Sequence, residues 1–254
     1  MMGPARRLLR RAAPEPLRLS VAALRRAWRD RLTGDASRML GPDARRAPGD
    51  LNVALRIVQP IRKSVHWQGK LANLRLAAAR LDGIIVEPDR LFSFWNILGR
   101  PSAANGFHIG RSIRADRLEA NVGGGLCQIS GLIYEMGLRA GMAIAERHPH
   151  TRDIYSEDAR FTPLGLDATV VWGHKDLRLR NVLAEPIVFA FTVADDAIEG
   201  RILAPAPIVL AELAIDRRDD PSGHRRLVSV SRRFAAQSLQ RVSQDEYLLA
   251  PESS

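Results

Sequence analysis

Apolar residues recur with helical spacing in three segments of the chain. The first, 17–32, places Leu, Val and Trp three to four residues apart and fills much of the remainder with Arg. The second runs from Val65 to Leu81 and stops at Asp82-Gly83, and the third runs from Gln128 to Arg139, before Gly141. Because this spacing keeps apolar side chains on one face, and Gly often ends a helix, we predict a helix over each segment.

Shorter apolar segments bounded by turn residues predict β-strands. Ile84–Val86 and Leu91–Trp95 flank turn residues 87–90 and indicate a hairpin. Another hairpin and several single strands are expected further along the chain. The hairpin pairs 111–113 with 117–120 across Ala115-Asp116, and the other strands are 142–146, 168–172, 177–180, 187–193 and 198–203, with a turn at Asp195-Asp196.

These elements predict an α+β fold in which a mostly antiparallel sheet packs against a central helix that starts at Cys127. We expect the core of this fold to span 51–205. Residues 1–50 are rich in Arg, Ala, Pro and Gly, and we interpret them as a basic N-terminal arm that carries the first helix.

The pattern weakens after about Ala206, so 206–254 is predicted to be a charged C-terminal extension. Its segment 214–226 is charged and turn-rich. Val228–Val230 and Tyr247–Leu249 are expected to add edge strands.

The chain has a net charge of +10, carried almost entirely by Arg. The basic residues concentrate in the two ends with few aromatic residues among them, so we expect no specific nucleic-acid partner. No apolar run is long enough to span a bilayer, and the N-terminus lacks the apolar core of a secretory signal. These features favour the cytoplasm or the cytoplasmic face of the membrane.

The helix over 17–32 has two interpretations. Its apolar stripe would usually pack on its own domain, and we favour that arrangement. Because Arg residues border the stripe, the alternative is a peripheral contact between 17–32 and an anionic membrane.

Cys127 is the single cysteine, and it follows Gly123, Gly124 and Gly125 at the start of the third helix. One cysteine excludes a disulfide within the chain and a Cys-rich zinc module. A thiol at a helix N-terminus tends to lose its proton and become nucleophilic. The alternative is a small residue buried at a tight helix start.

Two histidines and an aspartate follow Cys127 along the chain, in an order that suits thiol catalysis. Cys127 would attack a substrate, His150 would act as base with His148 as substitute, and Asp167 would orient the imidazole. Gln128, by its side chain or its backbone N–H, would help to hold an oxyanion. The layout is analogous to that of papain and transglutaminase-like enzymes.

Each of these residues also has a structural interpretation. Either histidine can serve as a hydrogen-bonded structural residue, and Asp167 can cap a turn. A further alternative joins Cys127, His148 and His150 in a metal site, but their spacing matches no standard zinc pattern. We therefore expect neither a resident metal nor a cofactor.

A set of short motifs surrounds Cys127 and continues on both sides of it. These motifs are 123–130, 134, 140–142 and 146–150, then upstream 73–74, 77–78, 81–83, 88, 92–94, 98–100 and 106–107, and downstream 165–170 and 176–181. In these residues the chain resembles the VanW family, and the resemblance covers roughly 51–205. Two departures are mild: the usual Pro-Gly-Glu turn is Pro88-Asp89-Arg90, and Thr151 stands where Ser is frequent.

The resemblance implies an association with the bacterial cell wall, because the family is named from a gene that accompanies a glycopeptide-antibiotic resistance cluster. It implies no particular reaction. We predict a cysteine-dependent hydrolase or acyltransferase acting on an amide or acyl bond of a cell-envelope peptide or glycan. The alternative is a binding module without turnover. Residues expected to contact the substrate are Gly123, Gly124, Gly125, Ser130 and Arg147.

Overall fold

The structure is a computed structural model that describes residues 15–45, 50–63, 65–114, 117–153, 160–235 and 237–249. Parts of the predicted N-terminal arm (1–14 and 46–49) and the predicted turn Ala115-Asp116 lie outside these residues. The helices are α2 (Glu15–Thr33), α3 (Asp35–Arg38), α4 (Trp67–Leu81), α5 (Phe94–Leu98), the 3-10 helix η1 (Ala103–Asn105) and α6 (Leu126–Ala140). The strands are β1 (Asn52–Pro60), β2 (Ile84–Val86), β3 (Leu91–Ser93), β4 (Ile109–Arg114), β5 (Arg117–Val122), β6 (Ala143–Glu146), β7 (Arg152–Asp153), β8 (Arg178–Arg180), β9 (Ile187–Val193), β10 (Ala197–Ala204), β11 (Glu212–Asp219), β12 (Arg225–Arg233) and β13 (Gln240–Leu249).

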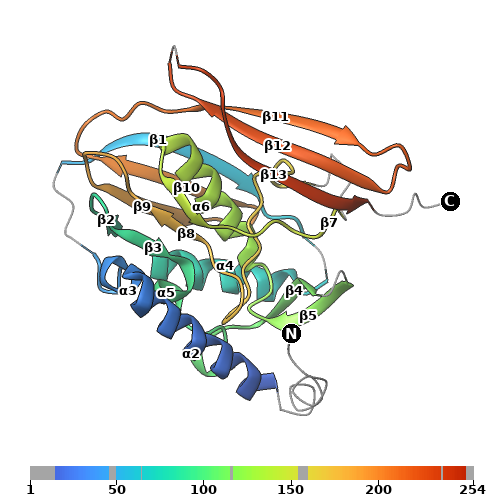
Figure 1. Cartoon of the computed structure of the whole chain (residues 1–254). Helices are drawn as coiled ribbons and strands as arrows, with labels where there is room; N and C mark the ends of the chain where they lie inside the picture. The colour runs from blue at the N-terminus through green and yellow to red at the C-terminus, as the bar shows by residue number, and fades with distance from the viewer. Residues whose placement is uncertain are drawn as a thin grey trace.

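The fold is α+β, as predicted, and α6 is its central helix (Figure 1). One side of α6 contacts β10 and β1 of the sheet ordered β1-β10-β9-β2, beside α4. On another side, Gly137 lies against Leu179 of the sheet β3-β8-β6. A helix enclosed in this way must be apolar nearly all round, and every residue of α6 is buried except Cys127 and Arg139.

The C-terminal strands form a separate sheet ordered β11-β12-β13-β7. Of the pairings between named strands in the described chain, only β13 with β7 is parallel. Val228, Val230 and Tyr247 turn their side chains inward and are fully buried. Val230 belongs to the same apolar cluster as the residues of α6, so this sheet covers part of the central helix.

All three predicted helices are present, as α2, α4 and α6. Gly141 ends α6 in the left-handed conformation, with φ 88°. The hairpins β4–β5 and β9–β10 are also confirmed. The first predicted hairpin is wrong, because β2 pairs with β9 whereas β3 pairs with β8. Every side chain of β3 is buried, as expected for a strand covered on both faces.

The predicted strand 168–172 is absent. Its start follows the side of α6, where the Ser130 hydroxyl donates to the Ala168 carbonyl at 2.6 Å. The Thr169 N–H donates to the His148 carbonyl at 2.7 Å. Hydrogen bonds to the Ser130 side chain and to the loop that carries His148 thus take the place of pairing with a neighbouring strand. The segment becomes part of the candidate site.

Three strand predictions near the ends of the chain also need correction. No element was predicted over 52–60, which forms β1 at the edge of a sheet. The segment 214–226 is not a set of turns: most of β11 and the start of β12 lie there, because Leu213 and Ile215 face inward between charged neighbours. β12 and β13 lie inside their sheet and are not edge strands.

Candidate active site

The glycine turn before α6 is determined by packing. Gly125 is the residue before the helix and has φ 99°, a conformation that L side chains rarely adopt. At Gly124 a Cβ would lie 2.1 Å from the carbonyl carbon and oxygen of Gly110 in β4. The side-chain amide of Asn73, a fully buried residue of α4, donates to the carbonyls of His108 and Gly124 at 2.9 Å each. The turn therefore fixes where α6 begins.

Cys127 lies in the first turn of α6, partly exposed. The His150 side chain and the backbone N–H of Val170 lie close enough to its thiol to act on the thiol's pKa. Burial by itself raises the pKa of a thiol. The hydrogen bond and positive charge of His150, together with the Val170 N–H, outweigh burial and lower the pKa of Cys127. The first turn of a helix also favours a negative charge.

His150 lies between the thiol and a buried carboxylate. Its Nδ1 is 2.7 Å from Oδ2 of Asp167, and its backbone N–H donates to the same oxygen at 2.7 Å. Burial acts to lower the pKa of the imidazole, but the hydrogen bonds with Asp167 and Cys127 raise it to about 10. The Asp167 contact directs the other ring nitrogen, Nε2, toward the sulfur. The pair is thus arranged as thiolate and imidazolium.

Asp167 is held by four donors besides the imidazole ring. Burial would raise its pKa, but the hydrogen bond and charge of His150 and the charge of Arg147 bring that pKa well below its usual range. Oδ1 accepts from the Tyr247 hydroxyl at 2.5 Å, from Nη2 of Arg147 at 3.1 Å and from the Gly165 N–H at 3.3 Å. A carboxylate bound this tightly keeps the imidazole in one orientation.

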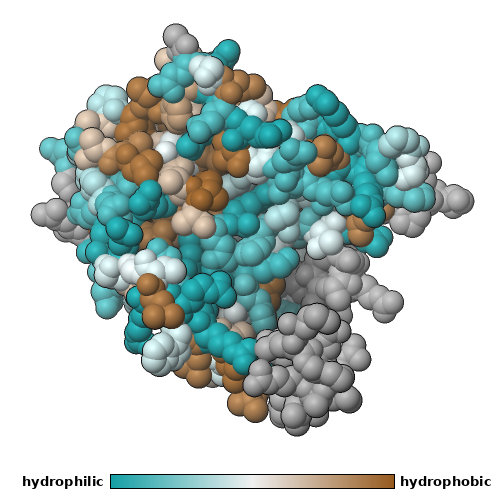
Figure 2. Space-filling view, in the orientation of Figure 1, coloured by the Kyte–Doolittle hydropathy of each residue, from teal (hydrophilic) through white to brown (hydrophobic). Residues whose placement is uncertain are grey.

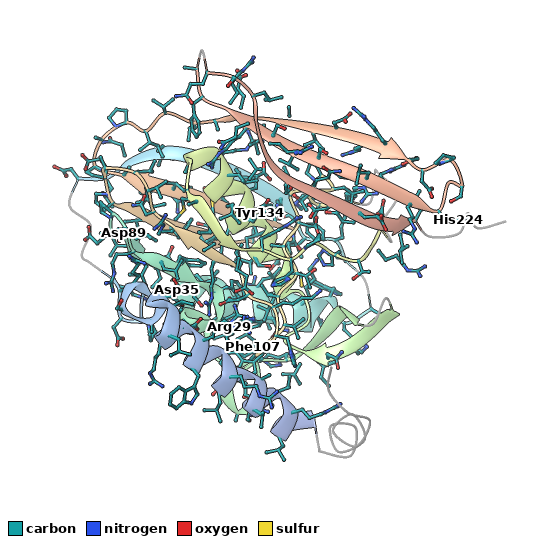
Figure 3. All side chains as sticks on the ribbon, in the orientation of Figure 1. Arg29, Asp35, Asp89, Phe107, Tyr134 and His224 are labelled. Atoms are coloured by element: carbon teal, nitrogen blue, oxygen red, sulfur yellow. The ribbon has the colours of Figure 1, made fainter. Side chains whose placement is uncertain are left out.

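Arg147 connects this carboxylate to the C-terminal sheet. Its guanidinium pairs with Asp167 and with Asp245 of β13, and its Nε donates to the Asp167 carbonyl at 2.8 Å. The guanidinium carbon also lies 4.9 Å from the ring centre of Tyr134, which Figure 3 labels on α6. Arg147 was predicted to contact the substrate, and the structure places its charge against these protein groups.

His148 is directed to a different cluster. Its Nε2 is 2.8 Å from Oε1 of Glu146, and the same oxygen accepts the Asp176 N–H. The other carboxylate oxygen of Glu146 pairs with Arg26 of α2. Burial, followed by the nearby positive charges of Lys175 and Arg26, lowers the pKa of His148. Of the two histidines, only His150 lies against Cys127, whereas His148, predicted as the substitute base, bonds to Glu146.

Two further predicted site residues use their polar groups within the protein. The side-chain amide of Gln128 donates to the Pro60 carbonyl at 2.9 Å, and its backbone N–H donates to the Gly125 carbonyl at 3.0 Å. The Ser130 hydroxyl donates to Ala168, as noted above. Gln128 and Ser130 are almost fully buried, so both hold the start of α6 in place.

The alternative of a metal site has no geometric support. Within the part of the chain that the structure describes, no three or more His, Cys, Asp or Glu side chains form a group able to hold a metal ion. Likewise, no helix among the described residues combines the length and apolar character needed to cross a bilayer.

Comparison with known proteins adds the family. The family model described as VanW like protein matches residues 69–203, which is more than half of the chain. The chain belongs to the VanW family. The match contains Cys127, His150 and Asp167, whereas Asp245 and Tyr247 lie beyond it.

Two curated relatives are similar over the VanW region. The uncharacterized protein YoaR of Bacillus subtilis is 35% identical over 116 residues, covering 46% of this chain and 37% of YoaR. The vancomycin B-type resistance protein VanW of Enterococcus faecalis is 29% identical over 140 residues, covering 55% of this chain and 51% of that protein. The chain thus spans about half or less of these relatives. No solved structure matches it.

Sequence reasoning missed the residues that fix Asp167 from outside the VanW match. Asp245 and Tyr247 lie in β13, about eighty residues or more from Asp167 along the chain. Nothing in their local sequence separates them from other polar and aromatic residues of a strand. Their proximity to Asp167 is indicated only by the pairing of β13 with β7, because β7 is the strand that follows the loop carrying His150.

Proposed function

We propose that the chain is a cysteine-dependent hydrolase or acyltransferase that acts on an amide or acyl bond. One observation carries the proposal: Nδ1 of His150 is 2.7 Å from the Asp167 carboxylate, and the same imidazole lies close enough to the Cys127 sulfur to lower the pKa of the thiol. Nucleophile, base and orienting acid in contact form the arrangement by which thiol enzymes transfer acyl groups.

The reaction follows from these contacts. The Cys127 thiolate attacks the substrate carbonyl carbon, and the His150 imidazolium gives its proton to the departing amine, which leaves a thioester on the sulfur. Water or a second amine then attacks the thioester as neutral His150 takes up a proton, and the thiolate is released with His150 protonated again. Because the side-chain amide and the backbone N–H of Gln128 each donate to a protein carbonyl, we assign the oxyanion to backbone N–H groups of the first turn of α6, beginning with that of Cys127.

The proposed substrate is an amide bond in a cell-envelope peptide. One point supports this class: the relative from Enterococcus faecalis is named as a vancomycin B-type resistance protein, which agrees with the cell-wall association that the family resemblance implies. The mechanism requires only a carbonyl with a leaving amine, so a peptide satisfies it better than an unmodified glycan.

The test uses the fact that Cys127 is the sole cysteine of the chain. The rate of alkylation by iodoacetamide, followed by mass spectrometry across pH 5 to 9 (roughly the range in which thiols titrate), reports the thiolate directly. We expect rapid alkylation of the wild type at the acidic end of this range. In His150→Ala the rate there falls at least about tenfold, because burial then raises the pKa of Cys127 and the largest opposing influence has been removed.

His148→Ala is the matched control and keeps the wild-type profile, since His148 bonds to Glu146. As a second readout, wild-type protein incubated with wall peptides releases new amino groups, and Cys127→Ala does not. Alkylation of His150→Ala at the wild-type rate and pH would refute the activated thiol. If Cys127 is activated but no wall peptide releases an amine, the protein is a thiol enzyme that acts on another class of substrate.

A further inference from the structure

The helix α2 presents two opposite faces that differ in chemistry. With 3.6 residues per turn, Leu19, Ala23, Arg26 and Asp30 fall on one side, and this side faces the domain. Asp30 is buried and accepts both terminal nitrogens of Arg178, at 2.7 and 2.8 Å, while Arg26 pairs with Glu146. At Gly173 a Cβ would lie 2.9 Å from the Leu19 carbonyl, so the backbones are in close contact. Charge pairs and close backbone packing thus anchor α2.

The opposite side carries the apolar stripe that usually faces a core. Its five side chains are between 38% and 83% exposed, and the largest of them, Trp28, is 64% exposed. The arrangement favoured from the sequence, in which this stripe packs on its own domain, is therefore wrong. A continuous apolar stripe on a helix surface is typical of an interaction site, unlike single exposed apolar residues. The stripe consists of Leu17, Val21, Leu24, Trp28 and Leu32.

Arginines border the stripe on both sides. Arg18, Arg25 and Arg29 follow one edge and Arg31 lies on the other, all of them exposed. Figure 2 shows brown and teal surface alternating where α2 lies in Figure 1, and Figure 3 labels Arg29 on this helix. The sequence just before α2 adds Arg6, Arg7, Arg10 and Arg11.

We propose that α2 is an interfacial helix that docks on an anionic lipid surface. The stripe inserts at the boundary of headgroups and acyl chains, and the bordering arginines bind lipid phosphates, an arrangement that combines apolar burial with charge complementarity. This proposal goes beyond the proposed catalytic function and does not depend on it. Because Arg26 of α2 pairs with Glu146, four residues before His150, docking would also hold the candidate site at the membrane.

The test is co-sedimentation of the full chain with vesicles. We expect the chain to bind vesicles made of equal amounts of phosphatidylcholine and phosphatidylglycerol, and to bind vesicles of phosphatidylcholine alone only weakly. Added salt should release it from the anionic vesicles. The double variant Leu24→Ser/Trp28→Ser should lower the partition coefficient at least about tenfold. Arg25→Glu/Arg29→Glu should lower it on anionic vesicles only.

Leu239→Ser and Arg241→Glu are the matched controls, because both residues are exposed on the C-terminal side of the chain. They should leave binding unchanged. The stripe variants are expected to fold, and an unchanged rate of Cys127 alkylation shows this. Three results would overturn the proposal: no binding of the wild type to anionic vesicles, an equal loss in the controls, or a wild-type dimer that the stripe variants convert to a monomer.

Discussion

Cys127 and His150 have opposite effects on how folding stability depends on pH. The folded pKa of His150 is about 10 against an ordinary 6.5, so its contribution is complete below pH 6.5 and is lost as pH rises toward 10. The pKa of Cys127 is lowered from 9.0, so its contribution is complete above pH 9.0 and is lost as pH falls. Between these ordinary values, wherever the folded thiol is ionised, the two effects oppose each other, because the folded pair then keeps its one proton on His150 and the unfolded pair keeps it on the thiol.

Cys127→Ala should therefore uncover the linkage of His150. Above pH 6.5 we expect the free energy of unfolding of this variant to fall by up to about 1.4 kcal/mol per pH unit, until the imidazole of the variant loses its proton. Urea unfolding at several pH values between 6.5 and 9.0 measures it. The wild type, and Cys127→Ala/His150→Gln, should show a much flatter profile. Equal slopes in the wild type and Cys127→Ala would show that the two groups do not share a proton.

At the scale of single residues, the sequence was most informative where the chemistry of the side chains and their spacing along the chain indicate the same site. Cys127, His150 and Asp167 could be predicted from their order and from the glycine turn. The choice between His148 and His150 could not, because it depends on which way each ring turns in a loop without regular structure. Gln128 also has the expected place in the chain, but its amide reaches Pro60, and only the tertiary structure shows that contact.

At the scale of elements, the start of α6 is fixed by three backbones in close contact. β4 approaches the glycine turn at Gly110 and Gly124, and it approaches α4 at Gly69, where a Cβ would lie 1.9 Å from the Ile109 carbonyl oxygen. Three glycines before a nucleophile suggest room for a ligand, whereas here Gly124 makes room for the Gly110 backbone, and Gly123 and Gly125 make room for the side chains of Pro101 and Lys70. The motif positions Cys127 through packing.

Gly124→Ala should consequently destabilise the fold by at least about 2 kcal/mol, because neither backbone can move without shifting α4 or α6. Thermal or urea unfolding measures the effect. Gly41→Ala is the control: no atom lies within 4 Å of the added methyl group, and its φ is not positive. It should be neutral or slightly stabilising. Similar losses in the two variants would mean that the close contact does not limit stability.

Strand partners were harder to predict than strands. The pattern located β2, β3, β9 and β10, but it assigned β2 and β3 to each other because they are neighbours in sequence. Their true partners come much later in the chain: β9 follows β2 by about one hundred residues, and β8 follows β3 by about ninety. The edge strand β1 was missed because only one of its nine residues is buried, which leaves little apolar alternation to detect.

At the scale of the molecule, the C-terminal sheet completes the site that the VanW region begins. Asp245 neutralises Arg147, and the Tyr247 hydroxyl donates to Asp167 while it accepts the Gly165 N–H at 3.1 Å. Burial, then the charge of Asp167, raises the pKa of Tyr247, so its hydroxyl stays a donor throughout the neutral range. The extension 206–254, which was predicted to be charged and to add two edge strands but no site residue, thus supplies residues that position the carboxylate.

Tyr247→Phe tests this contribution from outside the VanW match. Loss of a buried hydrogen bond to a charged group should cost about 1.5–3 kcal/mol of stability and, because Asp167 then holds His150 less firmly, slow alkylation of Cys127 in acid. Tyr134→Phe is the control, since its hydroxyl bonds to Ser243. That variant should leave the alkylation profile unchanged. An unaltered profile in Tyr247→Phe would show that Arg147 and Gly165 suffice to hold the carboxylate.

The thiolate held by His150 also determines how the chain responds to oxidants. Peroxides react with the thiolate form and convert it to a sulfenic acid, which a neighbouring cysteine usually captures as a disulfide. Cys127 has no such neighbour, because it is the only cysteine in these 254 residues. Recovery of the oxidised sulfur must therefore come from a thiol outside these residues, and without one the oxidation proceeds to the irreversible sulfinic and sulfonic acids.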